Sequence, residues 1–149
     1  MKNRGFTLLE VLIYIALFSV LIGGAIVAGY NLLESGNRNE TAVAIQEEGN
    51  FLNRKINWAL TGATSVTASS PTTLTVVRSD LGTLVFTASA GSLTLTRGSA
   101  TPTTLNSAAF SIDNLAFAVT PAQGGLPASV VVNFSIQGRP FTFGRYLRQ

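Results

Sequence analysis

The sequence predicts an α+β protein in which one long N-terminal helix packs on an antiparallel β-sheet. Three features of the chain predict this: an uncharged apolar run near the N-terminus, a helical stripe of apolar residues after it, and alternating apolar residues over the remaining half. The length of 149 residues suits a single folded domain. Hydrophobic residues make up 46% of the chain and charged residues 11%, a composition that excludes intrinsic disorder.

Cysteine and histidine are both absent from the chain. Their absence excludes disulfide bonds, a thiol nucleophile, a Cys/His zinc site and a histidine general base. The adjacent pair Glu47 and Glu48 does not change this, because neighbouring helical residues diverge by about 100° and cannot share one site. Asp80 and Asp113 fall at predicted turns. We therefore expect no enzyme activity, no cofactor and no metal site.

The apolar run extends from Val11 to Leu33, 23 residues without an acid or a base. A helix of this length rises about 34 Å, and a bilayer core is about 30 Å thick, so the segment can span a membrane. Lys2 and Arg4 precede the run. The positive-inside tendency therefore predicts a cytoplasmic N-terminus and an exported C-terminal part.

A secretory signal peptide and a plain membrane anchor both explain this segment incompletely. A signal peptide has an apolar region of about 7–15 residues and a small-x-small cleavage site, whereas this run is longer and Ile26-Val27-Ala28 is a poor site. An anchor fits the length but leaves Glu10 unexplained, because a carboxylate costs about 2–3 kcal/mol at the centre of a membrane and less near an end. Such a residue usually has a partner.

Residues 4–10, with the sequence Arg-Gly-Phe-Thr-Leu-Leu-Glu, closely resemble the processing signal of type IV pilins and of the pseudopilins of type II secretion. The resemblance implies a pilin-like fold, with cleavage after Gly5 by a prepilin peptidase and methylation of the new N-terminal residue, Phe6. It is strong over residues 1–30 and only general in architecture beyond them.

The resemblance also implies that Glu10 is the acidic residue that the family uses in filament assembly. Cleavage would remove the leader charges Lys2 and Arg4 but create an amine on Phe6, which stays cationic up to a pH of about 8. Within lipid, the amine of one subunit and the Glu10 carboxylate of its neighbour can neutralise each other. The partners implied are a prepilin peptidase/methyltransferase, other pilin or pseudopilin subunits, and an inner-membrane assembly platform. The implied location is the cytoplasmic membrane, as a single-pass protein, and then a cell-surface or periplasmic filament.

The apolar run carries two further features. Gly23-Gly24 and Gly29 either let the helix loosen when the subunit leaves the membrane or allow close helix packing, and both interpretations stand. Major pilins commonly have proline near Val27, and residues 16–18 are similar to those of minor pseudopilins of the tip complex. These departures favour a minor subunit.

Helical periodicity continues beyond the apolar run. Apolar or small residues recur at spacings of three and four, a stripe on one helical face formed by Ala42, Ile45, Gly49, Leu52, Ile56 and Ala59. The sequence therefore predicts one helix of about 55 residues, whose C-terminal half packs on its own sheet.

The second half of the chain predicts strands. Thr61 to Thr73 is rich in small polar residues and predicts a connector. Alternating apolar residues then predict strands around Leu74/Val76, Leu84/Phe86, Leu93/Leu95, Phe110/Ile112, Leu115/Phe117/Val119, Val130/Val132/Phe134/Ile136 and Phe141/Phe143. Tight turns at 79–82 and 90–91 join the first three strands as an antiparallel meander, and 138–140 joins the last two. The expected parts are a leader at 1–5, an assembly helix at 6–33, an amphipathic helix at 34–60 and a β domain at 61–149.

A second hypothesis makes the chain a membrane-anchored binding module at a filament tip, for DNA or for an exported protein. Basic residues in its favour are Arg78, Arg97, Arg139, Arg145 and Arg148, the last two beside Tyr146. Binding to phosphates would require these charges to lie on one face. Without Lys2 and Arg4, the ten basic residues fall to eight against seven acidic ones, a net charge of +1. A solvated surface is therefore the favoured interpretation of these arginines.

Overall fold

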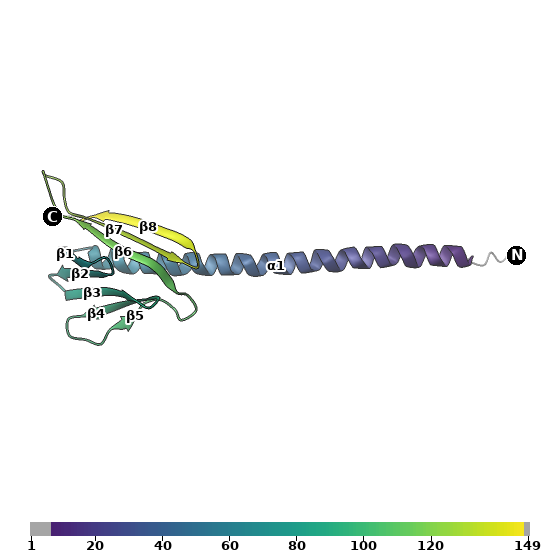
Figure 1. Cartoon of the computed structure of the whole chain (residues 1–149), viewed down its shortest axis with the longest axis horizontal. Helices are drawn as coiled ribbons and strands as arrows, with labels where there is room; N and C mark the ends of the chain where they lie inside the picture. The colour runs from purple at the N-terminus through teal and green to yellow at the C-terminus, as the bar shows by residue number, and fades with distance from the viewer. Residues whose placement is uncertain (1–6, 148–149) are drawn as a thin grey trace. The chain divides into compact units, whose positions relative to one another are not determined.

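The computed structural model describes residues 7–147, and the chain divides into two compact units, Met1–Ala42 and Val43–Gln149. Helix α1 (Leu8–Leu60) has 53 residues and continues from the first unit into the second (Figure 1). This confirms the single long helix that the sequence predicts. Antiparallel strands follow it, and the fold class is α+β and pilin-like, as expected.

The second unit contains two antiparallel sheets rather than the single sheet expected from the sequence. The five-stranded sheet follows chain order, with β1 (Ala63–Ser70), β2 (Thr73–Arg78), β3 (Gly82–Ser89), β4 (Ser92–Arg97) and β5 (Thr103–Thr104). The three-stranded sheet contains β6 (Ile112–Thr120), β7 (Ser129–Ile136) and β8 (Arg139–Tyr146), again in order. The two predicted hairpin groups thus form separate ladders. Backbone hydrogen bonds join the sheets, from Phe117 N to Pro71 O at 2.7 Å and from Ile112 N to Gly91 O at 2.9 Å.

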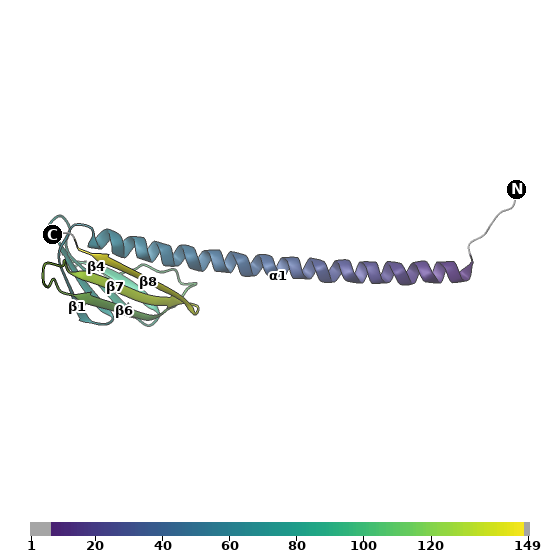
Figure 2. The same ribbon diagram turned by 90° about the horizontal axis from the view of Figure 1, so that it is seen from above.

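The core lies between the last turns of α1 and the two sheets, which lie on one side of this part of the helix (Figure 2). Leu52, Ile56 and Ala59 of the predicted stripe have no exposed surface, and Ile45 is 4% exposed. They pack with the buried faces of the strands, formed by Leu74, Val76, Leu84, Phe86, Leu93, Ile112, Leu115, Phe117, Val130, Val132, Phe134 and Ile136. The amphipathic stripe therefore does what its periodicity predicts.

Gly49 is the point of closest approach between α1 and β8. A Cβ atom built on Gly49 would overlap the Phe141 ring, since it would lie closer to Cε1 than non-bonded carbon atoms approach each other. The Phe141 ring in turn stacks on Phe134, with centroids 5.1 Å apart and ring planes 11° apart. Glycine at position 49 therefore lets an aromatic ring lie directly against the helix backbone.

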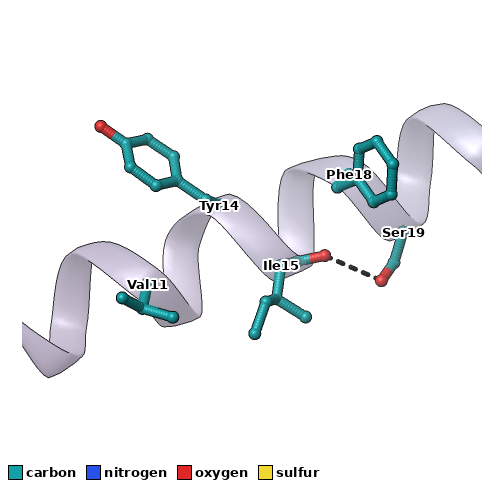
Figure 3. Close-up of a pocket in the computed structure, with 5 residues that line it drawn as sticks. All are labelled: Val11, Tyr14, Ile15, Phe18 and Ser19. Atoms are coloured by element: carbon teal, nitrogen blue, oxygen red, sulfur yellow. Dashed lines mark hydrogen bonds between the residues drawn. The ribbon is translucent and has the colours of Figure 1, made fainter.

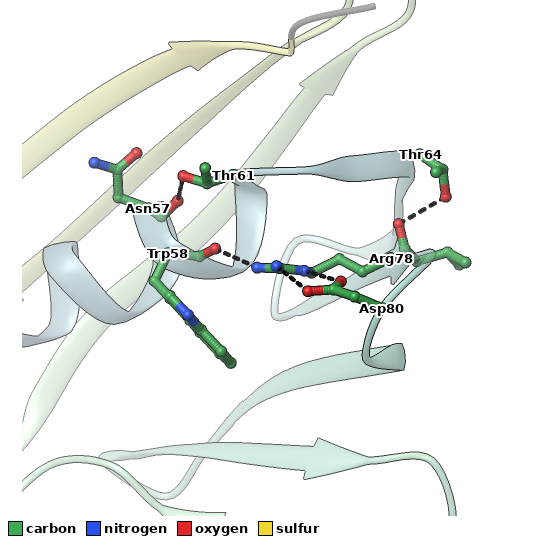
Figure 4. A network of polar contacts seen from close by, with 7 residues as sticks. Asn57, Trp58, Thr61, Thr64, Arg78 and Asp80 are labelled. Carbon is green, nitrogen blue, oxygen red and sulfur yellow. Dashed lines mark hydrogen bonds and ion pairs between the residues drawn. The ribbon is translucent and has the colours of Figure 1, made fainter.

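The C-terminus of α1 is capped by a residue from the sheet. The last turn of the helix contains no basic residue, but Arg78 at the end of β2 donates from Nη1 to the carbonyl oxygen of Trp58 at 2.8 Å (Figure 4). Thr61 donates from Oγ1 to the Asn57 carbonyl at 2.8 Å, and Gly62 follows at a φ of 80°. A positive charge and a left-handed glycine both stabilise a helix C-terminus.

Strand β1 corrects the prediction that residues 61–73 form a connector. Its side chains are mostly small, polar and exposed, so they lack the alternation that marks a strand in sequence. Residues 63–70 become a strand because their backbone pairs with β2, with Val66 opposite Val76. Backbone pairing between neighbouring strands depends on tertiary contacts, and the pattern of side chains in the sequence does not reveal it.

Strand β6 unites two segments that the sequence analysis treats separately, and Phe110 lies before it rather than in it. Its register with β7 shifts between Asp113 and Ala116, and Asn114 has a φ of 54°. This bulge inserts an extra residue, so that Ile112 and Leu115, three apart, both face the core. The alternation of apolar residues is therefore interrupted in the sequence because the bulge shifts the core-facing positions by one residue within a single strand.

Asn106 is a buried polar residue that holds the loop between β5 and β6. Its Oδ1 accepts a hydrogen bond from Leu93 N at 2.9 Å, and its Nδ2 donates to Phe110 O at 2.8 Å and to Gly91 O at 3.3 Å. Glu48 of α1 accepts from Ser107 N at 2.7 Å. Together these contacts fasten the loop to the β3–β4 turn and to the helix.

Candidate functional site

The N-terminal end of α1 is the first candidate site, because the predicted assembly residue lies in its first turn. Thr7 caps the helix: its carbonyl and its Oγ1 accept hydrogen bonds from Glu10 N at 3.1 and 3.3 Å. A threonine three residues before a glutamate is a capping-box pattern, which fixes where a helix begins. The acidic side chain of Glu10 near the positive end of the helix dipole is also favourable.

The Glu10 carboxylate is directed along the helix toward Tyr14. The Tyr14 hydroxyl donates to Glu10 Oε1 at 3.2 Å, one turn further along α1. A hydroxyl is a neutral partner, so this contact leaves the negative charge of the carboxylate in place. Glu10 is therefore positioned but not neutralised by the contacts described for it.

The surface next to Glu10 is apolar and has no protein cover. Val11, Ile15 and Phe18 form a shallow face flanked by Tyr14 and Ser19 (Figure 3). The Ser19 hydroxyl donates to the Ile15 carbonyl at 2.8 Å, so this polar group is satisfied within the helix, as apolar surroundings require. None of residues 7–42 is buried. By length and composition, α1 can cross a membrane.

The glycines of the apolar run do not interrupt α1. The helix is continuous through Gly23-Gly24 and Gly29, and no other part of the described chain lies within 4 Å of a Cβ placed on any of them. Their surface is open to a lipid tail or to another helix. Both interpretations of these glycines, loosening and close packing, remain compatible with a helical conformation.

The predicted processing residues lie outside the residues that the structure describes. These are the leader charges Lys2 and Arg4, and the cleavage and methylation positions Gly5 and Phe6. Comparison with protein families covers them: residues 1–26 match the model of the prokaryotic N-terminal methylation motif. The chain therefore carries this motif, which indicates the type IV pilin and pseudopilin family. No curated protein and no solved structure matched the chain.

The second candidate site is a basic groove between α1 and β4. The groove measures about 320 Å³ and is lined by Phe51, Arg54, Lys55, Trp58, Leu95 and Arg97. Two of its cations rest on aromatic rings: Lys55 Nζ lies 5.5 Å from the centroid of Phe51, and the Arg97 guanidinium lies 5.3 Å from the centroid of Trp58. Such cation–π contacts order side chains that would otherwise be mobile.

Arg78 lies next to this groove but is already neutralised. Its Nε and Nη2 donate to Asp80 Oδ1 and Oδ2 at 2.8 and 2.6 Å, and its guanidinium lies 5.3 Å from the Trp58 centroid (Figure 4). The hydrogen bond from Arg78 lowers the pKa of the Asp80 carboxyl, and the same bond raises the pKa of Arg78. Arg78 is thus a structural cation that joins β2 to the helix terminus.

The structure separates the arginines that the sequence groups near the C-terminus. Arg145 donates from β8 to Asn57 Oδ1 on α1, Arg139 begins β8 at the opposite end of that strand, and Tyr146 is exposed. Arg148 lies outside the described residues. The groove instead joins Arg97 to Arg54 and Lys55. Sequence reasoning misses this cluster because Arg97 lies more than 40 residues from Arg54 and Lys55, although the helical spacing of Phe51, Lys55 and Trp58 is visible.

Metal binding has no support among residues 7–147, where no three acidic, cysteine or histidine side chains come together. The Pro121–Pro127 loop contains one isolated bridge between Gln123 and Leu126 and carries no acidic residue.

Proposed function

We propose that this chain is a structural subunit of a type IV pilus or of a type II secretion-like filament. The observation that carries the proposal is the N-terminal methylation motif leading directly into α1, whose apolar surface has no cover over residues 8–33. Large exposed apolar surfaces require lipid or protein neighbours. A helix that is surrounded by lipid before assembly and by other subunits in the filament meets that requirement at both stages.

Processing at the N-terminus prepares the subunit for assembly. A prepilin peptidase/methyltransferase cuts between Gly5 and Phe6, removes the leader charges Lys2 and Arg4, and methylates the new amine of Phe6. Methylation keeps the amine cationic. The leader at 1–5 thus holds the N-terminus on the cytoplasmic side until cleavage, while residues 34–149 are exported.

Glu10 then sets the register between subunits. Its carboxylate lies in the first turn of α1 and accepts a hydrogen bond from the Tyr14 hydroxyl, which is a neutral donor. The Phe6 amine of a neighbouring subunit supplies the matching cation, since a buried charge is tolerated when paired and costly when alone. Residues 6–33 form the assembly segment, residues 34–60 the amphipathic continuation, and residues 61–149 the exported β domain.

The chain fits a minor subunit that assembles with sibling pilins on an inner-membrane platform. Val27 occupies the position near which major pilins commonly have proline, and α1 is unbroken there. Its role is structural rather than catalytic, with no cofactor. Detection in filaments at low abundance beside a more abundant pilin would support the minor role, and an abundance equal to that of the main subunit would contradict it.

Mass spectrometry of the mature N-terminus tests the processing step. We expect a chain that starts at Phe6 with one methyl group on its amine. A mature chain starting elsewhere, or an uncut precursor present in filaments, would overturn the proposal.

Pull-out of filaments through a tagged copy tests the role of Glu10. Glu10→Ala should leave cleavage intact but abolish recruitment of the chain. Glu34→Ala removes a carboxylate from the same helix beyond the apolar run and should have no such effect. Tyr14→Phe removes the hydroxyl but keeps the Glu10 charge and should also assemble. Normal recruitment of Glu10→Ala would contradict the pairing.

A further inference from the structure

Three side chains give the groove between α1 and β4 a local positive charge. They are Arg54, Lys55 and Arg97, and no acidic side chain among the described residues lines the groove with them. The carboxylate of Asp80 is paired with Arg78, which lies next to the groove, rather than with any of the three. The charge of these cations is therefore available to a ligand.

Two of the three cations are ordered before any ligand binds. Lys55 Nζ lies over the ring of Phe51, and the Arg97 guanidinium lies over the ring of Trp58. Both cations extend from regular elements, α1 and the end of β4. Because ordered side chains lose little conformational freedom on binding, the groove is a preformed site for an anionic group.

Apolar surface lies beside the cations. Leu95 is half-buried in the wall of the groove, and Trp58 is 37% exposed. The groove measures about 320 Å³, whereas one water molecule takes about 30 Å³ of the liquid. It is therefore much larger than a lone carboxylate or phosphate requires, and a ligand that fills it needs a partly apolar body beside its charge.

Nucleic acid meets this description poorly. Trp58 already carries the guanidinium groups of Arg78 and Arg97, each 5.3 Å from its ring centroid, so its ring is not free to stack on a base. A nucleic acid strand also requires cations spaced along its backbone. The arginines of β8, Arg139 and Arg145, belong to the other sheet and do not line the groove.

An acidic sugar has the properties that the groove requires. The C–H groups of a sugar ring form an apolar surface that can pack on Leu95 and on the exposed part of Trp58. The carboxylate of a uronate accepts charge-assisted hydrogen bonds, in pairs from an arginine. We propose that the groove binds a uronate unit of an acidic polysaccharide, with Arg54, Lys55 and Arg97 around its carboxylate. This goes beyond the proposed filament function and does not require that the chain assemble.

Fluorescence of Trp58 reports on the groove directly, because the chain has one tryptophan. The full-length chain in an uncharged detergent is titrated with trigalacturonate, triglutamate and maltotriose. Triglutamate keeps the carboxylates without the sugar, and maltotriose keeps the sugar without the carboxylates. We expect a saturating change with trigalacturonate, at a Kd about fivefold or more below that of either control. Equal affinity for triglutamate would indicate unspecific charge attraction and would overturn the proposal.

Substitution of the groove cations tests their role. Arg54→Gln and Arg97→Gln should each raise the Kd for trigalacturonate about fivefold or more, and salt should reduce the difference. Arg139→Gln removes the same charge from β8, outside the groove, and should leave the Kd unchanged. Urea midpoints of the three variants establish that each is folded. Equal weakening by Arg139→Gln would contradict a site in the groove.

Competition on immobilised polygalacturonate distinguishes polysaccharide from nucleic acid. We expect trigalacturonate to elute the bound chain, and a single-stranded oligonucleotide at the same concentration of negative charge to leave it bound. Elution by the oligonucleotide and not by trigalacturonate would replace the polysaccharide with nucleic acid.

Glu10→Ala separates this inference from the proposed function. Because Glu10 and the groove lie in different compact units, this variant should bind trigalacturonate with unchanged affinity while failing to assemble. Assembly of the unaltered chain without binding of trigalacturonate would make the groove proposal alone wrong. Binding by a chain that is neither cut at Phe6 nor assembled would make the filament proposal alone wrong.

Discussion

At the residue scale, Gly49 illustrates how one missing side chain shapes a helix–sheet contact. Phe141 occupies the space where a Cβ atom would lie, and its ring is fixed by stacking on Phe134. Helix propensity alone favours alanine at a helical position by about 1 kcal/mol. Close packing opposes it by about 1–3 kcal/mol, because an aromatic ring must move.

Gly49→Ala should therefore lower the free energy of unfolding by up to about 2 kcal/mol. Urea unfolding of the full chain in detergent micelles, followed by fluorescence of the single tryptophan, Trp58, measures this change. Gly36→Ala is the control, since nothing lies within 4 Å of its Cβ position. Adding Phe141→Leu should reduce the cost of Gly49→Ala, and an undiminished cost would show that the ring is not the cause.

Asp80 gives the β domain a defined dependence on pH. The hydrogen bond from Arg78 holds the pKa of this carboxyl below its ordinary value of 3.8. Because the pKa is lower in the folded chain, the carboxylate adds stability above the unfolded pKa, and this is lost as the pH falls through the folded pKa.

Asp80→Asn should thus lower the urea midpoint at neutral pH, and the difference from the unaltered chain should shrink in acid. The midpoints of both chains, measured from pH 7 downward, test this. A difference that stayed constant into acid would mean that the charge of Asp80 does not contribute.

At the scale of elements, the C-terminal turns of α1 act as the cover for both sheets. Leu52 and Ile56 are fully buried, in the same hydrophobic cluster as side chains from strands of each sheet. Residues on other faces of the helix stay exposed, including Val43 at 57%. The stability of the β domain therefore depends on a stripe that occupies only one face of the helix.

Leu52→Ala should lower the free energy of unfolding by about 2–5 kcal/mol, since it removes a buried side chain and leaves a cavity. Val43→Ala should change it by less than about 0.5 kcal/mol. Thermal or urea unfolding of both variants tests the contrast. Similar costs for the two substitutions would show that the helix does not pack on the sheets as described.

At the scale of the whole molecule, the chain combines an apolar segment without protein contacts and a domain that contains the core. All buried hydrophobic side chains among the described residues lie between Ile45 and Leu147. Residues 8–33 contribute none of them. The first part therefore exposes its apolar side chains, whereas the second buries its own.

Residues 34–149 alone should therefore be soluble without detergent and unfold within about 0.5 kcal/mol of the full chain, because no core residue is removed. Sedimentation and urea unfolding measure both properties. The full-length chain, which should require detergent or membrane, is the control. Aggregation of the shorter chain would indicate that the apolar segment completes the fold.

Most of the architecture could be predicted because it follows local rules. The uncharged run, the stripe from Ala42 to Ala59 and the turns at 90–91 and 138–140 depend on residue spacing and turn chemistry, which a sequence displays directly. The motif at residues 1–26 is equally local, and it indicates the family.

What the tertiary structure decided involves residues that are distant in sequence. The pairing that makes β1 a strand, the bulge at Asn114 and the division into two sheets depend on which backbone lies beside which. The groove of Arg54, Lys55 and Arg97 exists because α1 and β4 meet. Local spacing determines helices and turns. Strand pairing and the clustering of charged side chains depend instead on contacts between residues that are distant in sequence and meet only in the folded chain.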